Sequence, residues 1–208
     1  MTGDYITLKG RGQDEFTEKK SRFIGYAAPA ASEEEAVAFI NEIRAKHRDA
    51  RHNVYAYIVN QNGVVNQRYS DDGEPQGTGG MPVLDVIQKR GLVNCCVVVT
   101  RYFGGVLLGA SGLVRAYSHG ASIAVDAAGI LPVVKCTSVK IELPYSLYDK
   151  VAKYMEEADF VQESADFAEN VVLVYSIPDR QVEDALEKLT DMTNGRAQIR
   201  IDSCFNVS

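Results

Sequence analysis

The chain of 208 residues is 46% hydrophobic and 24% charged, with 22 basic and 28 acidic side chains and a formal net charge of −6. This composition is that of a globular protein. It excludes a disordered chain and a protein that binds nucleic acid through net charge alone. Residues 1–133 carry 14 basic and 14 acidic side chains, so the whole deficit lies in the last third. We therefore expect two units with different surfaces.

The sequence favours a cytoplasmic protein without a membrane partner. It contains no run of about 18 apolar residues, and its N-terminal segment lacks the apolar core of a signal peptide. The cysteines show no zinc-site spacing, and we interpret all four as structural thiols. They are Cys95, Cys96, Cys136 and Cys204. No metal or cofactor is predicted.

The first part of the chain alternates strands and helices. In chain order we expect strands at 5–8 and 22–28, a helix at 33–48, a hairpin of strands 54–59 and 64–69, a helix at 82–90, a strand at 93–102 and a helix at 111–128. Ser32 and Glu35 have the spacing of a capping box, and Gly129 ends the long helix.

The second part shows a β-α-β-β-α-β order. The expected elements are a strand at 134–143, a helix at 147–157, strands at 161–164 and 171–177, a helix at 181–192 and a strand at 198–205. This order is typical of a ferredoxin-like domain. The sequence thus predicts an α+β protein with domains at 1–132 and 133–208.

Glycine marks the segments where chemistry can take place. Nine of the 17 glycines lie between Gly73 and Gly112, eight of them in the runs SDDGEPQGTGGMP, RYFGG and LGASGLVRAY. Free backbone N–H groups in a glycine-rich turn that opens a helix can hold an anion, which gives two candidate anion sites, at 78–81 and 109–112. Ser111 supplies a hydroxyl that could contact a phosphate. The alternative is that these glycines only allow tight turns and close helix–sheet packing.

Charged side chains accompany these glycines. Asp71, Asp72 and Glu74 could pin their loop by accepting backbone N–H bonds, which the spacing favours, or could hold a cation or act in acid–base chemistry. Basic and aromatic side chains could form a groove for RNA or another polyanion, or the cations could pair with the acidic cluster. These side chains are Lys19, Lys20, Arg22, Arg101, Arg115, His119, Tyr69, Tyr102, Phe103 and Tyr117. His52 is interpreted as a hydrogen-bonded structural group, and no catalytic constellation is recognised.

The segments SRFIGYAAPA, HNVYAY, YSDDGEPQGTGGMPVLDVI and VVVTRYFGGVLLGASGLVRAYS resemble the IMPACT family in its bacterial, YigZ/YvyE-type form. The resemblance covers residues 15–128. It implies that the first domain is like the second domain of ribosomal small-subunit protein five. The C-terminal 75 residues look like the second domain of the bacterial members, which is similar to the C-terminal domain of elongation factor G.

The resemblance implies a role in translational control. We therefore expect a non-enzymatic, translation-associated regulatory protein that binds RNA, the ribosome or a translation-related protein. The alternatives are a phosphate-handling or hydrolytic metal-dependent enzyme that uses the glycine-rich loops, and a pure protein–protein adaptor. Apart from Ser111, the expected binding surface consists of the family's motif residues: Asp71, Asp72, Glu74, Thr78, Arg101, Gly104, Gly105, Arg115 and Tyr117. The sequence does not indicate an oligomeric state.

Overall fold

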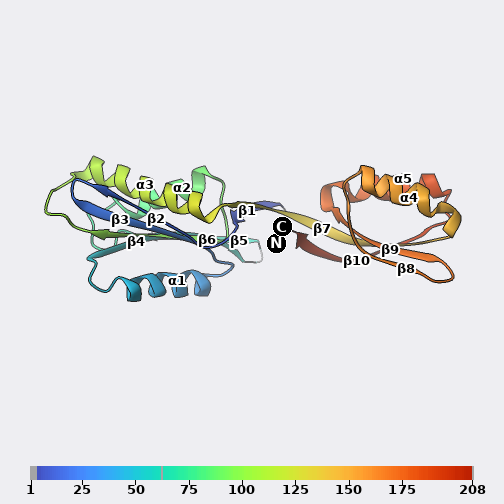
Figure 1. Cartoon of the computed structure of the whole chain (residues 1–208), viewed down its shortest axis with the longest axis horizontal. Coiled ribbons are helices and arrows are strands. Elements are labelled where there is room, and N and C mark those ends of the chain that lie inside the picture. The colour runs from blue at the N-terminus through green and yellow to red at the C-terminus, as the bar shows by residue number, and fades with distance from the viewer. Residues whose placement is uncertain (1–3, 62, 208) are drawn as a thin grey trace. The chain divides into compact units, whose positions relative to one another are not determined.

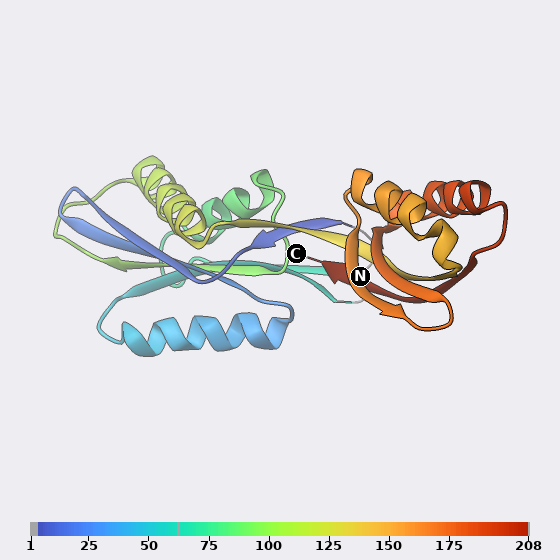
Figure 2. The same ribbon diagram turned by 45° about the vertical axis from the view of Figure 1, so that its right-hand side comes forward.

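The computed structural model describes residues 4–61 and 63–207. The chain divides into two compact units, Met1–Pro132 and Val133–Ser208, each with a sheet and helices of its own (Figures 1 and 2). The expected α+β class is therefore confirmed.

The first unit is built on a five-stranded antiparallel sheet with the order β2-β3-β6-β4-β5. Its strands are β2 (Gly12–Glu18), β3 (Ser21–Pro29), β4 (His52–Gln61), β5 (Val64–Ser70) and β6 (Cys95–Tyr102). The central strand β6 is covered on both faces, which explains its continuous apolar sequence. Val97 and Val99 belong to one core, whereas Cys96 and Val98 belong to the other.

Three helices cover this sheet, α1 (Glu33–Lys46) on one face and α2 (Gly80–Lys89) with α3 (Ala110–Ala128) on the other (Figures 1 and 2). The expected capping box is present at α1. The Ser32 hydroxyl accepts a hydrogen bond from the Glu35 N–H at 3.2 Å, and the Glu35 carboxylate accepts one from the Ala31 N–H at 2.7 Å. Strand β1 (Tyr5–Leu8) forms a parallel bridge from Ile6 to Leu92, close to α2.

Strand β2 was not predicted, because its sequence GQDEFTE is polar and only Phe16 packs on the core. Pairing with β3 and a close approach of α3 hold it in place instead. At Gly12 an added Cβ would lie 2.2 Å from the backbone nitrogen of Ala128, so glycine is required at this contact. Propensity could not reveal a strand that tertiary packing determines.

The second unit has the strand order β8-β9-β7-β10, all antiparallel. Its strands are β7 (Ile130–Leu143, which begins in the first unit), β8 (Val161–Phe167), β9 (Val171–Pro178) and β10 (Gln198–Val207). Helices α4 (Tyr145–Glu157) and α5 (Val182–Thr193) cover one face, and the short 3₁₀ turn η1 (Asp179–Gln181) precedes α5 (Figure 1). This is the ferredoxin-like arrangement expected from the sequence.

The two cysteines of β6 lie in the cores on the two faces of the first unit's sheet. Cys95 and Cys96 are fully buried, and burial raises the pKa of Cys95 to about 12 and that of Cys96 well above its ordinary value. Cys136 is also buried, whereas the side chain of Cys204 lies outside the described residues. Within the described part of the chain, no helix has both the length and the apolar character needed to cross a membrane.

Candidate functional site

The loop between β5 and α2 is fixed by the side chain of Asp71. Its carboxylate accepts hydrogen bonds from the N–H groups of Gly77, Gly79 and Gly80, at 2.9, 2.9 and 2.8 Å. Burial acts to raise the pKa of Asp71, but these three donors hold it below its ordinary value. The anion site expected at 78–81 is therefore wrong as a ligand site, because the protein's own carboxylate takes the N–H groups at this helix end.

Asp72 ties the same loop to the neighbouring elements. It has a positive φ of 46° and accepts hydrogen bonds from Arg44 at 2.6 Å and from the Asn53 N–H at 2.7 Å. The hydroxyl of Thr78 is also engaged, because it donates to the carbonyl of Pro75 at 2.6 Å. The side chains of Asp71, Asp72 and Thr78 thus hold the loop in shape.

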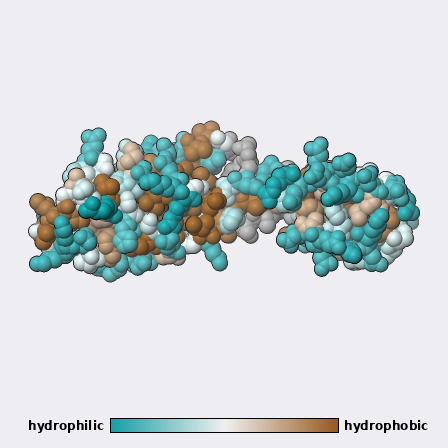
Figure 3. Space-filling view, turned by 90° about the horizontal axis from the view of Figure 1, so that it is seen from above, coloured by the Kyte–Doolittle hydropathy of each residue, from teal (hydrophilic) through white to brown (hydrophobic). Residues whose placement is uncertain are grey.

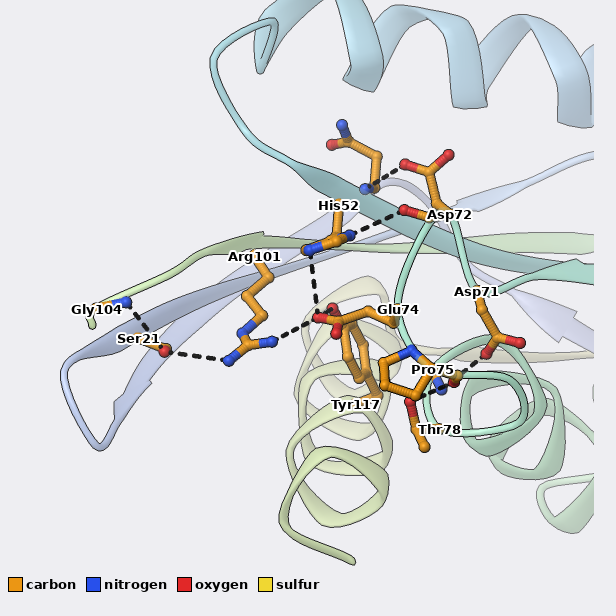
Figure 4. A network of polar contacts seen from close by, with 12 residues as sticks. Ser21, His52, Asp71, Asp72, Glu74, Pro75, Thr78, Arg101, Gly104 and Tyr117 are labelled. Atoms are coloured by element: carbon orange, nitrogen blue, oxygen red, sulfur yellow. Dashed lines mark hydrogen bonds and ion pairs between the residues drawn. The ribbon is translucent and has the colours of Figure 1, made fainter. Parts of the chain in front are cut away.

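Glu74 lies at the centre of a buried polar network (Figure 4). Its Oε1 accepts hydrogen bonds from Nη1 of Arg101 at 2.6 Å and from the hydroxyl of Tyr117 at 2.7 Å, and Nε2 of His52 lies 3.9 Å away. Burial, together with the adjacent Glu74 carboxylate, raises the pKa of Tyr117 far above its ordinary value. The network joins β6, α3 and the β5–α2 loop.

Arg101 is enclosed by aromatic rings and by the end of the β2–β3 hairpin. Its guanidinium lies 5.4 Å from the ring centroids of both Phe23 and Phe103, and Nη2 contacts the Ser21 hydroxyl at 3.5 Å. That hydroxyl also accepts the N–H of Gly104 at 3.2 Å (Figure 4). Nε of Arg101 is buried and finds no hydrogen-bond partner within residues 4–61 and 63–207.

The three carboxylates of the motif thus point to different partners. Asp71 accepts backbone N–H groups at the N-terminus of α2, Asp72 binds Arg44 and the N–H of Asn53, and Glu74 binds Arg101. Across the described residues, no group of three His, Cys, Asp or Glu side chains is placed to hold a metal. This arrangement does not supply the metal site that the enzymatic alternative requires.

The second predicted anion site, at 109–112, remains open. Gly109, the N-cap residue of α3, has a φ of +75° and no side chain, so it supplies no acceptor to the first-turn N–H groups. Ser111 and Arg115 are exposed on the first turns of α3, and Gly105, with a φ of +83°, lies in the exposed loop before it.

An apolar cavity of about 370 Å³ lies beside this helix end. We call it the apolar cavity. Apolar side chains make up most of its wall, and His52, Arg51, Glu74 and Arg101 form its polar end. The lining apolar residues are Phe103, Leu107, Leu108 and Leu113, together with Pro75 and Ala110.

A second cavity, of about 500 Å³, shares Leu108 with the apolar cavity as a lining residue. We call it the basic cleft, because Lys19, Arg115 and His119 line it and Glu18 is the acidic residue of its wall. Lys19 comes from the turn between β2 and β3, and Arg115 and His119 lie on one face of α3.

The cation–aromatic groove expected from the sequence is only partly present. Arg22 pairs with Glu15 at 2.6 Å, and the hydroxyl of Tyr102 donates to Asp49 at 3.0 Å. Tyr117 is buried in the network around Glu74. The expected salt bridge to the acidic cluster forms at Arg101, whereas Lys19, Lys20 and Arg115 form no ion pair within the described residues.

Exposed hydrophobic side chains lie in the loop that borders the apolar cavity. Leu107 is 81% exposed, and Phe103 and Val106 in the same loop are 46% and 40% exposed. Figure 3 views the unit from the side of α2 and α3 and shows hydrophobic atoms gathered at its left end, where the β6–α3 loop turns in Figure 1.

Sequence reasoning missed Arg51 and Leu107 and assigned His52 only a structural role. His52 does form a structural contact, because its Nδ1 donates to the carbonyl of Asp72 at 2.9 Å. Its Nε2, however, lies on the side of Glu74 and the apolar cavity. The adjacent Arg51 and His52 at the start of β4 and the run of apolar residues in a glycine-rich loop were the available signals.

Two family comparisons match most of the chain. Residues 19–125 match the family described as the Impact N-terminal domain, and residues 141–196 match one described as a domain of unknown function, DUF1949. The IMPACT family member YvyE of Bacillus subtilis is 36% identical over 96% of this chain and 92% of its own length. The protein IMPACT homolog of Dictyostelium discoideum is 40% identical, over 50% of this chain and 29% of its own.

A solved structure shares the fold of the whole chain. It is titled as the crystal structure of a hypothetical protein, is 29% identical and has a TM-score of 0.62 over 98% of this chain and 99% of its own.

Proposed function

The chain belongs to the IMPACT family, and from this premise we propose that it is a translation-associated regulatory protein that binds RNA through the basic cleft. It acts by binding rather than by catalysing a reaction. The single observation that carries this proposal is the set of unpaired cations at the cleft.

Lys19 and Arg115 converge on one cleft and have no carboxylate partner within the described residues. Unpaired cations along a groove attract the phosphates of a nucleic-acid strand. The exposed ring of Phe103, on the loop that also supplies Leu108, offers a surface on which a base can stack. These groups suit a single strand whose phosphates follow the cleft.

The neutral total charge of the first unit does not oppose this function, because its charges are segregated. The motif carboxylates Asp71, Asp72 and Glu74 are engaged inside the unit with backbone N–H groups or with Arg44 and Arg101. The cations of the basic cleft, Lys19 and Arg115, are instead exposed at the surface. The acidic second unit is suited to a basic protein surface near the RNA.

Binding of a labelled single-stranded RNA to the full chain, followed by fluorescence anisotropy, tests the proposal. Lys19→Gln and Arg115→Gln should each weaken binding several-fold. Arg68→Gln on β5 is the matched control, because Arg68 is exposed, unpaired among the described residues and absent from the cleft. No binding at low salt, where phosphate contacts are strongest, would overturn the proposal. Equal binding by the cleft variants and the control would do the same.

A nuclease-insensitive pull-down dominated by one protein would instead identify a protein–protein adaptor. If the chain cosediments with ribosomes and nuclease treatment abolishes this cosedimentation, the result agrees with RNA binding.

A further inference from the structure

The polar end of the apolar cavity is not used by the proposed RNA site, which shares Phe103 with the cavity but takes its cations from the basic cleft. Its volume of about 370 Å³ lies in the range of small-molecule sites. Such sites combine apolar walls with a few convergent polar groups, and this cavity has both. The question is which chemistry its polar end accepts.

The charges at the polar end favour an anion. The charges of Glu74 and Arg101 offset each other, because the Glu74 Oε1 lies 2.6 Å from Nη1 of Arg101. Arg51, in contrast, is exposed and makes no ion pair within the described part of the chain. Gly109 and Ala110, at the uncapped positive end of α3, also line the cavity. The lining therefore carries an excess of positive charge.

A buried donor without a partner supports the same conclusion independently. Arg101 is 95% buried (5% exposed) and lines the cavity, and its Nε–H finds no acceptor within the described residues. On the same guanidinium, Nη2 makes only a 3.5 Å contact with Ser21. Phe103, which lies against this guanidinium, is 46% exposed. Arg101 thus brings a donor without a partner to the wall of the cavity, beside Phe103.

The other face of the cavity is apolar. Leu107 is 81% exposed next to the 46% exposed Phe103, and Leu108 and Leu113 continue the same wall, so the apolar side chains are grouped here rather than scattered singly. A bare inorganic anion would leave this wall uncovered. A ligand with both a negative group and an apolar body would satisfy both ends.

The geometry points to a binding site for a small organic anion, a carboxylate or phosphate ester with an apolar body. Its negative group lies between Arg51 and the start of α3, within reach of Arg101. Its apolar body packs on Phe103, Leu107 and Leu108. The size of the cavity suits a body as large as a phenyl ring or a chain of about six carbons.

Isothermal titration of the full chain with paired probes tests this proposal. Phenyl phosphate and hexanoate are the anionic probes, and phenol, hexan-1-ol and inorganic phosphate are the controls that lack one half of the ligand. At least one anionic probe should bind saturably and at least about tenfold more tightly than its neutral counterpart. Phenyl phosphate should also exceed inorganic phosphate. The tighter of the two anionic probes identifies the headgroup as a phosphate ester or a carboxylate.

Variants separate this site from the RNA site. Arg51→Gln and Leu107→Ser should each weaken binding of the tighter probe, and Arg68→Gln should leave it unchanged. Arg115→Gln, which removes a cation of the basic cleft, should weaken RNA binding and leave probe binding intact. The inference is overturned if no probe binds saturably, if the neutral probes bind as tightly as the anions, or if Arg51→Gln has no effect.

Discussion

Replacing Glu74 by glutamine should cost the first unit about 3–5 kcal/mol of unfolding free energy, because it leaves the guanidinium of Arg101 buried without its counter-charge. The two side chains are only 4% and 6% exposed, so little water can replace the lost carboxylate. Tyr117→Phe, which removes one hydrogen bond to a charged acceptor, should cost about 1.5–3 kcal/mol. Glu74→Gln should therefore be the more damaging change.

Urea unfolding followed by circular dichroism measures both losses, since the chain has no tryptophan. The transition of the second unit, which contains neither residue, is the internal control. Adding Arg101→Met to Glu74→Gln should restore part of the stability, because an apolar side chain of similar volume needs no counter-charge. A loss below about 1 kcal/mol for Glu74→Gln would refute this reasoning, as would strictly additive effects in the double variant.

Three further changes test the elements that support the site. Asp71→Ala should destabilise the first unit by about 2–3 kcal/mol, because three N–H groups lose a charged acceptor; unfolding in urea measures this loss. Gly104→Ala should cost about 1–3 kcal/mol, because its Cβ would lie 1.9 Å from the carbonyl oxygen of Lys20; an unchanged melting temperature would contradict this. Burial holds the pKa of His47 below its ordinary value, so the unfolded chain takes up the proton first and stability should fall as the pH drops below about 6.5. His47→Gln should reduce that pH dependence, and an identical pH profile in the variant would argue against this assignment.

The helices and the buried strands could be predicted because their local signals agree with the packing. Ser32 and Glu35 form the capping box that their spacing indicates, and Gly129 ends α3 with a φ of +72°. Strand β6 reads as continuously apolar because helices cover both faces of its sheet. In contrast, β2 carries no such signal, since pairing and close packing at Gly12 hold it in place.

The candidate site was predictable in its residues but not in their roles. The sequence singled out Asp71, Asp72 and Glu74, yet only the three-dimensional structure shows that Glu74 alone pairs with Arg101, 27 positions away. Likewise, free N–H groups were expected at 78–81 because nothing in the loop sequence shows that the carboxylate of Asp71 folds back onto them. The apolar cavity is lined by residues from both the start of β4 and the β6–α3 loop, and local patterns do not encode that these segments come together.

The salt dependence of RNA binding tests the central claim most directly. For a single strand, the logarithm of the affinity should fall linearly with the logarithm of the salt concentration, and each phosphate contact contributes about 0.7 to the slope. Arg115→Gln should lower both the affinity and the slope, the latter by about 0.7, whereas Arg68→Gln should retain the slope of the unaltered chain. If the Arg115→Gln slope equals that of the unaltered chain, or if the chain binds no RNA at low salt, the basic cleft is not an RNA-binding site.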